Sequence, residues 1–205
     1  MGNRTEVFLD AGASVVCVEP QPDCVSELRR RFSDRITLVD AAVGAKVGQA
    51  QLHMATYHTL ASLSPEWIDE VQASGRFSEF EWPTTLEIEL TTLDVLVDAY
   101  GSPDFCKIDV EGYELEVIEG LTRPIRALSF EFTAERFESR AAAVRRLDGL
   151  GMTEFNFSFG ESLEFVFDAW TDADDLMAFL SGPAAASPVS FGDVYARQPS
   201  LELGT

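Results

Sequence analysis

The sequence predicts an α/β domain built on a mostly parallel β-sheet, with an antiparallel pair at one edge. Helical and strand-like patterns alternate from the start of the chain, which is typical of a parallel sheet covered by helices. The predicted parallel strands end at acidic residues. Two short aromatic segments, 152–160 and 162–170, meet around Gly160 and Glu161 and are predicted to form the antiparallel pair.

The first part of the chain supplies five elements of this sheet. Helices are predicted over 3–12 and 20–32, and strands over 15–18, 36–39 and 49–54. Pro22 and Asp23 suit the first turn of the second helix. Val15–Val18 is a continuous apolar run of the kind found in buried parallel strands. Residues 49–54 instead alternate polar and apolar side chains, which is typical of an edge strand.

The remainder of the chain continues the alternation. Helices are predicted over 65–71, 92–100, 113–121, 134–150 and 172–180, and strands over 86–90, 105–110 and 127–132. Thr91 or Thr92 is expected to cap the second of these helices. The aromatic, acidic stretch 75–82 is predicted to be a loop over a pocket. Residues 183–205 are rich in Ala, Pro and Ser and are predicted to be a poorly anchored tail.

Composition limits the class of protein. The 205 residues suffice for one domain, predicted over 1–182 and followed by the tail. The chain has 35 acidic and 15 basic residues and a formal net charge of −20, which argues against nucleic acid as a partner, because binding it requires a basic surface. No apolar run approaches the roughly 20 residues of a membrane span, and no signal peptide opens the chain. We therefore predict a soluble, cytoplasmic protein.

The three cysteines agree with that compartment. Cys17, Cys24 and Cys106 are odd in number and widely spaced, and two of them lie in apolar strand-like runs. This pattern favours reduced thiols over a disulfide framework. It does not favour a metal site, and none is predicted.

The segment 103–119, PDFCKIDVEGYELEVIE, changes from strand to helix at an acidic corner. The corner contains Asp109, Glu111 and Gly112. Ligands of open α/β sheets bind at the carboxyl ends of the strands, so this corner is a candidate site. The alternative is structural, with one of the two carboxylates capping the helix that follows.

Four acidic residues end four different predicted strands: Glu19, Asp40, Asp109 and Glu131. In a parallel sheet they would lie along one rim. In nucleotide-binding sheets, an acid at the end of the second strand can accept hydrogen bonds from both hydroxyl groups of a ribose, and this role suits Glu19. Asp40 is placed to meet an adenine amino group. Each acid taken alone has the alternative role of a loop residue or a helix cap.

Five segments together carry a family resemblance: VVCVEPQPDC, LVDAAVG, TTLDVL, DFCKIDVEGYELEVIEG and LSFEF. From Gly2 to about Phe132 the chain resembles the FkbM-type methyltransferases, which use S-adenosyl-L-methionine. The resemblance implies a Rossmann-like class I methyltransferase sheet and transfer of a methyl group to a hydroxyl of a sugar or other small metabolite.

The resemblance also implies roles for individual residues. Glu19 would hold the ribose, Asp40 and Ala41 would border the adenine, and Asp109 would stand near the methyl donor. Glu131 would lie toward the acceptor, which is expected to be a small molecule or a glycan.

The sequence departs from the family at its beginning. Such enzymes are expected to open with a strand and the loop Asp-x-Gly-Ala-Asn-x-Gly, of which only Gly2 and the residues just after it match. We therefore expect an N-terminally truncated sheet that lacks its first strand, with Met1 at an internal codon of a longer reading frame.

The residue that takes the acceptor's proton is left open by the sequence. The candidates are Asp109, Glu131, His53 and His58. His58 has the alternative of an exposed loop histidine, and His53 that of a structural residue in an edge strand. Lys107 should share a sheet face with Asp109 and is expected to neutralise it.

Two other functions are weighed against methyl transfer. One is a truncated, non-catalytic α/β module that binds no cofactor. The other is an NAD-dependent dehydrogenase, which would also explain Glu19, but the chain has no Gly-x-Gly-x-x-Gly after a strand.

Overall fold

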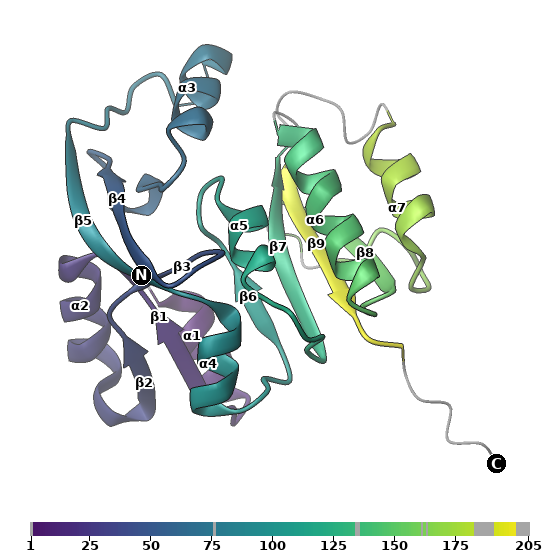
Figure 1. The fold of residues 1–205 in the computed structure, drawn as a ribbon, viewed down its shortest axis with the longest axis horizontal. Helices are drawn as coiled ribbons and strands as arrows, with labels where there is room; N and C mark the ends of the chain where they lie inside the picture. Colours follow the sequence, from purple (N-terminus) through teal and green to yellow (C-terminus); the bar gives the residue numbers. More distant parts are fainter. Residues whose placement is uncertain are drawn as a thin grey trace.

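The structure is a computed structural model that describes residues 2–75, 77–133, 136–160, 162, 164–182 and 191–199. Within these ranges it contains seven α-helices and nine β-strands, arranged in three hydrogen-bonded sheets (Figure 1). None of the described helices has the length and hydropathy that crossing a membrane requires.

The first sheet contains β1 (Val15–Val18) and β2 (Ile36–Val39), which pair in parallel with Val18 opposite Val39. They are joined by α2 (Pro22–Phe32) and preceded by α1 (Asn3–Asp10). All four elements agree with the prediction. Pro22 occupies the first turn of α2, and the apolar residues of α2 at helical spacing are buried.

The second sheet has the order β3-β5-β4. It contains β3 (Ala42–Val43), β4 (Gly48–Met54) and β5 (Thr84–Thr91). β4 pairs antiparallel with β5 at an edge of the sheet, as its alternating sequence predicted. Between them lie the 3-10 helix η2 (His58–Leu60) and α3 (Pro65–Ser74).

The predicted loop after α3 forms a small apolar cluster. Phe77, Phe80 and Trp82 pack against the buried Trp67 of α3, and the indole N–H of Trp82 donates to the Leu60 carbonyl at 2.7 Å. The aromatic residues of this loop therefore pack against α3 and η2, which belong to the same segment between β4 and β5.

The third sheet has the order β6-β7-β9-β8. Its strands are β6 (Cys106–Ile108), β7 (Ala127–Thr133), β8 (Glu154–Phe159) and β9 (Phe191–Arg197). The helices of this half are α4 (Leu93–Tyr100), α5 (Glu114–Glu119), α6 (Phe137–Gly149) and α7 (Ala173–Leu180). Thr92 caps α4, since its hydroxyl accepts from the Val95 N–H at 3.2 Å.

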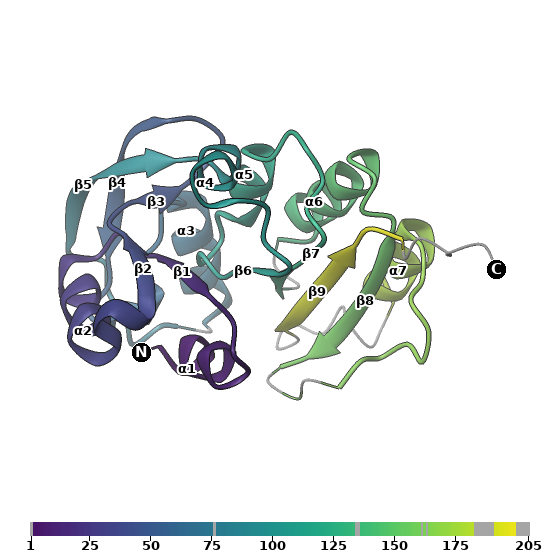
Figure 2. The same ribbon diagram turned by 90° about the horizontal axis from the view of Figure 1, so that it is seen from below.

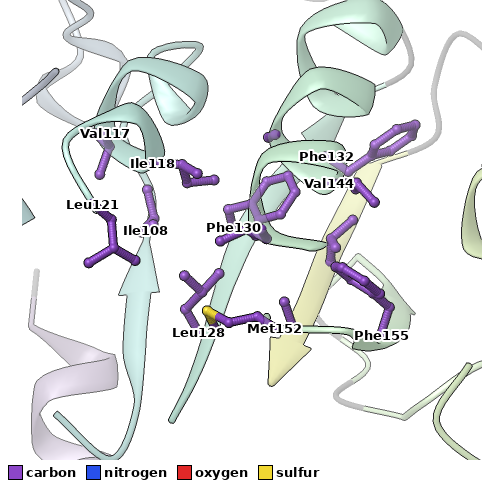
Figure 3. Packing of buried hydrophobic residues seen from close by; sticks show 14 of the residues in the cluster. Ile108, Val117, Ile118, Leu121, Leu128, Phe130, Phe132, Val144, Met152 and Phe155 are labelled. Carbon is purple, nitrogen blue, oxygen red and sulfur yellow. The ribbon is translucent and has the colours of Figure 1, made fainter. Parts of the chain in front are cut away.

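The main core lies on one face of the third sheet. Ile108, Leu128 and Phe130 of the parallel pair β6–β7 pack with side chains from α5 and α6, as Figure 3 shows. Aromatic residues of β8 and helix α7 extend this core toward the far edge. This buried face holds β6 and β7 in place, and with them Asp109, which follows β6, and Glu131, which lies within β7.

The C-terminal part differs from the prediction. Residues 191–197, expected within a poorly anchored tail, form β9, which lies between β7 and β8. The predicted strand over 162–170 is not a strand in its described residues; Asn156 instead binds both the Phe167 N–H and its carbonyl through its side chain. Gly192, Val194 and Ala196 alternate toward the core, and the Ala-, Pro- and Ser-rich composition before them concealed this short alternation. Residues 183–190 and 200–205 lie outside the described residues.

The described strands form three sheets rather than the single, mostly parallel sheet that was predicted. The ladders β1–β2, β3–β5 and β6–β7 are parallel, and β4–β5, β7–β9 and β8–β9 are antiparallel. Among the described residues no strand pairs with β1 on the side away from β2, or with β6 on the side away from β7. Val16, predicted to be buried, is 40% exposed. Figures 1 and 2 show β1 and β6 as neighbours with α1 beside them.

Candidate active site

The acidic corner predicted after β6 forms a tight turn. Glu111 and Gly112 both have positive φ angles, 50° and 94°. The Ser62 hydroxyl donates to the Glu111 carbonyl at 2.6 Å, and the Gly112 N–H donates to the Glu114 carboxylate at 3.0 Å. A non-glycine residue in the left-handed region is unfavourable by about 1–3 kcal/mol, and such residues cluster at functional sites. The turn is therefore held from two sides in a conformation that it would not adopt alone.

Trp67 of α3 lies directly against this turn. A β-carbon at position 112 would overlap the Trp67 side chain, so only glycine fits there. Trp67 is itself buried, and the N-terminus of its helix is capped by Ser64. The segment between β4 and β5 thus supports the acidic turn from a distance of more than forty residues in the sequence.

A row of polar side chains crosses the third sheet beside the turn. Glu131 of β7 stands opposite Asp193 of β9, which stands opposite Ser158 of β8. Residues opposite one another in a ladder lie on the same face. The ammonium of Lys107 on β6 contacts the Asp193 carboxylate at 2.6 Å and that of Asp109 at 3.9 Å. The main partner of Lys107 is thus Asp193, whereas the sequence predicted Asp109.

Asp193 was not predicted as a site residue, because this aspartate lies in the segment that was predicted to be a tail. The signal that could have found it is the alternation of Gly192, Val194 and Ala196, which places residue 193 on the face opposite the core. Gly192 is required there, because a β-carbon would overlap the Ser158 carbonyl.

These residues line a small cavity at the end of β6 and β7. Its polar lining is formed by Arg4 of α1, Lys107, Asp109, Glu131 and Asp193. Asp109 is 57% exposed at its side chain, whereas Asp193 is nearly buried. Arg4 brings the N-terminal helix to this site, and its charge favours the ionised form of Asp193.

The electrostatics of the cavity favour protonated carboxyl groups. Burial, together with the charges of Asp109 and Glu114, raises the pKa of Glu131 to about 8. Burial and the charges of Glu131 and Asp109 raise the pKa of Glu111 well above its usual range. For Lys107, burial alone would lower the pKa, but Asp109 and Asp193 outweigh it and the pKa is raised. Glu131 is therefore a group that exchanges its proton near neutral pH.

The raised pKa of Glu131 predicts that the protein loses stability as the pH rises. Between about 4.5, the ordinary pKa, and about 8, the folded chain holds a proton that the unfolded chain has released. Unfolding therefore becomes easier across this window. We expect the melting temperature to fall from pH 5 to pH 8, and to fall less in Glu131→Gln. Glu138→Gln, an exposed glutamate on α6, is the control and should retain the full slope. An unchanged slope in Glu131→Gln would contradict the assignment.

Glu19 and Asp40 form a second acidic pair at the ends of β1 and β2. Val18 pairs with Val39, so the two acids follow at adjacent strand ends. One carboxylate oxygen of Glu19 accepts from the Gln21 N–H at 2.9 Å. Burial and the nearby charge of Asp40 raise the pKa of Glu19. Asp40 is exposed and Ala41 is buried beside it. These strand ends can offer carboxylate oxygens to the hydroxyl or amino groups of a ligand.

The remaining predicted residues are placed less centrally. Gly2 is the N-cap of α1 with a φ of 75°, and it packs against Phe32 of α2. His53 lies in β4 opposite Thr85 and bridges to Ser62, which suits its predicted structural role. His58 begins η2, and its side chain lies outside what the structure describes.

The structure thus brings the predicted acids together in two groups. Glu19 and Asp40 lie at the β1–β2 ladder, and Asp109 and Glu131 lie at the β6–β7 ladder. Helix α1 contacts β1 through Thr5 and Cys17, and it contacts the segment before β6 through Phe8 and Phe105. This helix therefore links the two groups, which no described ladder joins.

Comparison with known proteins gives one match. Residues 3–181 match the family model described as the methyltransferase FkbM domain. No curated protein and no solved structure matches the chain significantly.

Proposed function

Since the chain belongs to the FkbM methyltransferase family, we propose that it transfers a methyl group from S-adenosyl-L-methionine to a hydroxyl group of a small-molecule or glycan acceptor. The observation that carries the proposal is the family match over 3–181, which includes both acidic groups of the candidate site. When bound, this donor supplies an electrophilic methyl group on a positively charged sulfur.

The residues proposed to hold the donor are Gly2, Glu19, Asp40, Ala41 and Asp109. The chemistry of these residues fits the group. Glu19 and Asp40 end adjacent strands with carboxylates that can accept from ribose hydroxyls and an adenine amino group, and the buried Ala41 offers an apolar contact. The acidic lining around Asp109 suits the positive charge of a sulfonium.

Glu131 is the base that the site supports best. Methyl transfer to a hydroxyl requires loss of the hydroxyl proton, and a base with a pKa near the working pH does this most effectively. The pKa of Glu131 is raised to about 8 by burial and neighbouring acids. Asp109 beside it is a second candidate for the catalytic carboxylate, and His58 remains a third. The protein's other contribution is to align donor and acceptor and to exclude water.

Replacing Glu19 tests the donor site. Glu19→Gln should weaken binding of S-adenosyl-L-methionine by about 10- to 100-fold, because hydrogen bonds to a charged group contribute about 1.5–3 kcal/mol. Isothermal titration of the 205-residue chain measures the effect. Asp34→Asn, which changes an exposed acid in the turn after α2, is the matched control and should bind as the parent chain does. Equal affinity in both variants would refute the role of Glu19.

A non-catalytic module that binds no cofactor is the second candidate. It is favoured by the division of the site, since Glu19 and Asp109 stand on ladders that no described strand connects. The same titration decides, because this candidate requires that neither S-adenosyl-L-methionine nor its product bind to the parent chain.

We propose that the reaction occurs in the cytoplasm. The support is the state of the cysteines, since Cys17, Cys24 and Cys106 are all free thiols in the structure. The acidic excess of the chain also argues against nucleic acid as the acceptor.

A further inference from the structure

We propose that the carboxyl groups around the cavity make the site selective for the positively charged methyl donor over its neutral product, with Glu131 exchanging one proton as that charge arrives and disappears. These carboxyl groups are those of Asp109, Glu131 and Asp193, which line the cavity, and that of Glu111 on the turn that follows Asp109. The inference rests on the proposed function and adds to it a proton that is bound and released with the donor.

The first support is the imbalance of charge around the cavity. Lys107 is bound at 2.6 Å by Asp193, which accounts for one carboxylate. Arg140 of α6, a buried cation that acts on Glu131, is paired at 2.7 Å with Glu114, and Arg4 of α1 is a further cation in the cavity lining. Asp109, Glu111 and Glu131 therefore have more potential negative charge than the cations beside them can balance.

The second support is that the lining points to a polar ligand. Ser158, opposite Asp193 in the same row, is 1% exposed, and its hydroxyl has no hydrogen-bond partner among the described residues. An unsatisfied buried hydroxyl is unfavourable by roughly 1–3 kcal/mol. The lining of the cavity, which Glu131 and Asp193 of this row share with Arg4, Lys107 and Asp109, is thus suited to a charged or hydrogen-bonding occupant.

The proton exchange follows from the surroundings of Glu131. The charged groups around it are Asp109, Glu111, Glu114, Asp193, Lys107, Arg140 and, across the cavity lining, Arg4 of α1. With its pKa near 8, Glu131 is mostly protonated at neutral pH when no ligand is present. A cation entering the cavity favours the carboxylate and releases the proton, whereas a neutral thioether does not.

The exchange also balances the reaction. Glu131, ionised in the presence of the sulfonium, accepts the proton of the acceptor hydroxyl. The oxygen forms a bond to the methyl carbon, and the electron pair of the broken carbon–sulfur bond remains on sulfur, which becomes neutral. The positive charge lost from sulfur is matched by the proton gained on Glu131, so the protonated state that suits the neutral product is restored.

Calorimetry of binding tests the inference without turnover. Titrations with S-adenosyl-L-methionine and with S-adenosyl-L-homocysteine at pH 7, each in two buffers of different ionisation enthalpy, give the number of protons released. We expect release of about half a proton or more with the donor and much less with the product. The affinity for the donor divided by the affinity for the product should rise with pH between 6 and 8, by at most about tenfold per pH unit. Because the sulfonium lowers the pKa of the donor's own amino group, the contribution of Glu131 is taken as the difference between the parent chain and Glu131→Gln with the same ligand.

Three variants of the full chain make the test specific. Glu131→Gln mimics the protonated residue and should remove the part of the proton release, and of its pH dependence, that Glu131 contributes in the parent chain. Glu111→Gln, on the acidic turn, should reduce but not abolish them, which keeps the test decisive if Glu131→Gln folds poorly. Asp104→Asn removes an exposed acid that pairs with Arg126 and should leave both unchanged.

The outcomes separate the two proposals. If the donor binds but releases no more protons than the product, or if Glu131→Gln releases as many as the parent chain, the inference is wrong and the methyl-donor site stands. If neither ligand binds at any pH between 6 and 8, the donor site is refuted and the inference falls with it.

Discussion

Replacing Arg140 by methionine is expected to lower the free energy of unfolding by about 3–5 kcal/mol, the usual effect of removing one partner from a buried ion pair. Arg140 and Glu114 are 1% and 0% exposed, with Nη2 and Oε2 2.7 Å apart. That contact is close but poorly aligned, since no guanidinium nitrogen of Arg140 makes a hydrogen bond within the described chain. Without Arg140, the Glu114 carboxylate would remain buried with its charge uncompensated.

Denaturant unfolding of two further variants separates this pair from general effects. Arg145→Met changes an exposed arginine on the same helix and should alter stability by no more than about 0.5 kcal/mol. The double variant Arg140→Met, Glu114→Leu should recover much of the loss, because apolar replacements for a buried pair are often neutral or stabilising. Recovery will be incomplete, since Glu114 also accepts from the Gly112 N–H. A single variant as stable as the parent would show that the pair is not buried in solution.

Replacing Gly112 by alanine is the second change with a large expected effect. A β-carbon would meet the Trp67 side chain, and the φ of 94° is unfavourable for any residue with a side chain. Overpacking contributes about 1–3 kcal/mol and the backbone about 1–2 kcal/mol, so we expect a loss of about 3 kcal/mol. The shifted turn carries Asp109 and Glu111, so binding of S-adenosyl-L-methionine should weaken as well.

Gly149→Ala is the matched control for this prediction. Position 149 ends α6, has no other atom within 4 Å of the added carbon, and should therefore keep both stability and binding. Melting temperature and calorimetric affinity measure the two effects. If Gly112→Ala behaved like Gly149→Ala, Trp67 would not support the turn.

Most elements were predictable because their signals are local. The run Val15–Val18, the cap at Thr92 and the alternation before Leu90 each lie within a few residues, and each gave the observed strand or helix start. The acids Glu19, Asp40 and Asp109 follow β1, β2 and β6 as those strand boundaries predict, whereas Glu131, predicted to end its strand, lies within β7 two residues before its end. Their grouping into pairs then follows from parallel pairing.

The features that were missed depend on contacts between distant parts of the chain. Asp193 reaches Lys107 only because β9 inserts between β7 and β8, and the composition around residues 183–190 gave no sign of that insertion. The fit of Gly112 against Trp67 joins segments forty-five positions apart, and glycine alone does not reveal its neighbour. The division into three sheets likewise depends on which strand edges meet, which periodicity within a strand does not specify.

Within the described part of the chain β1 and β6 each have one unpaired side, and this gives the proposed ligand a mechanical role. Glu19 and Asp40 belong to one ladder and Asp109 and Glu131 to another, so their separation is set by helix packing rather than by backbone hydrogen bonds. A molecule that contacts both groups would act as the cross-link that these ladders lack. Its arrival should slow amide hydrogen exchange along both strands, and the methyl donor would then be part of what makes the domain rigid.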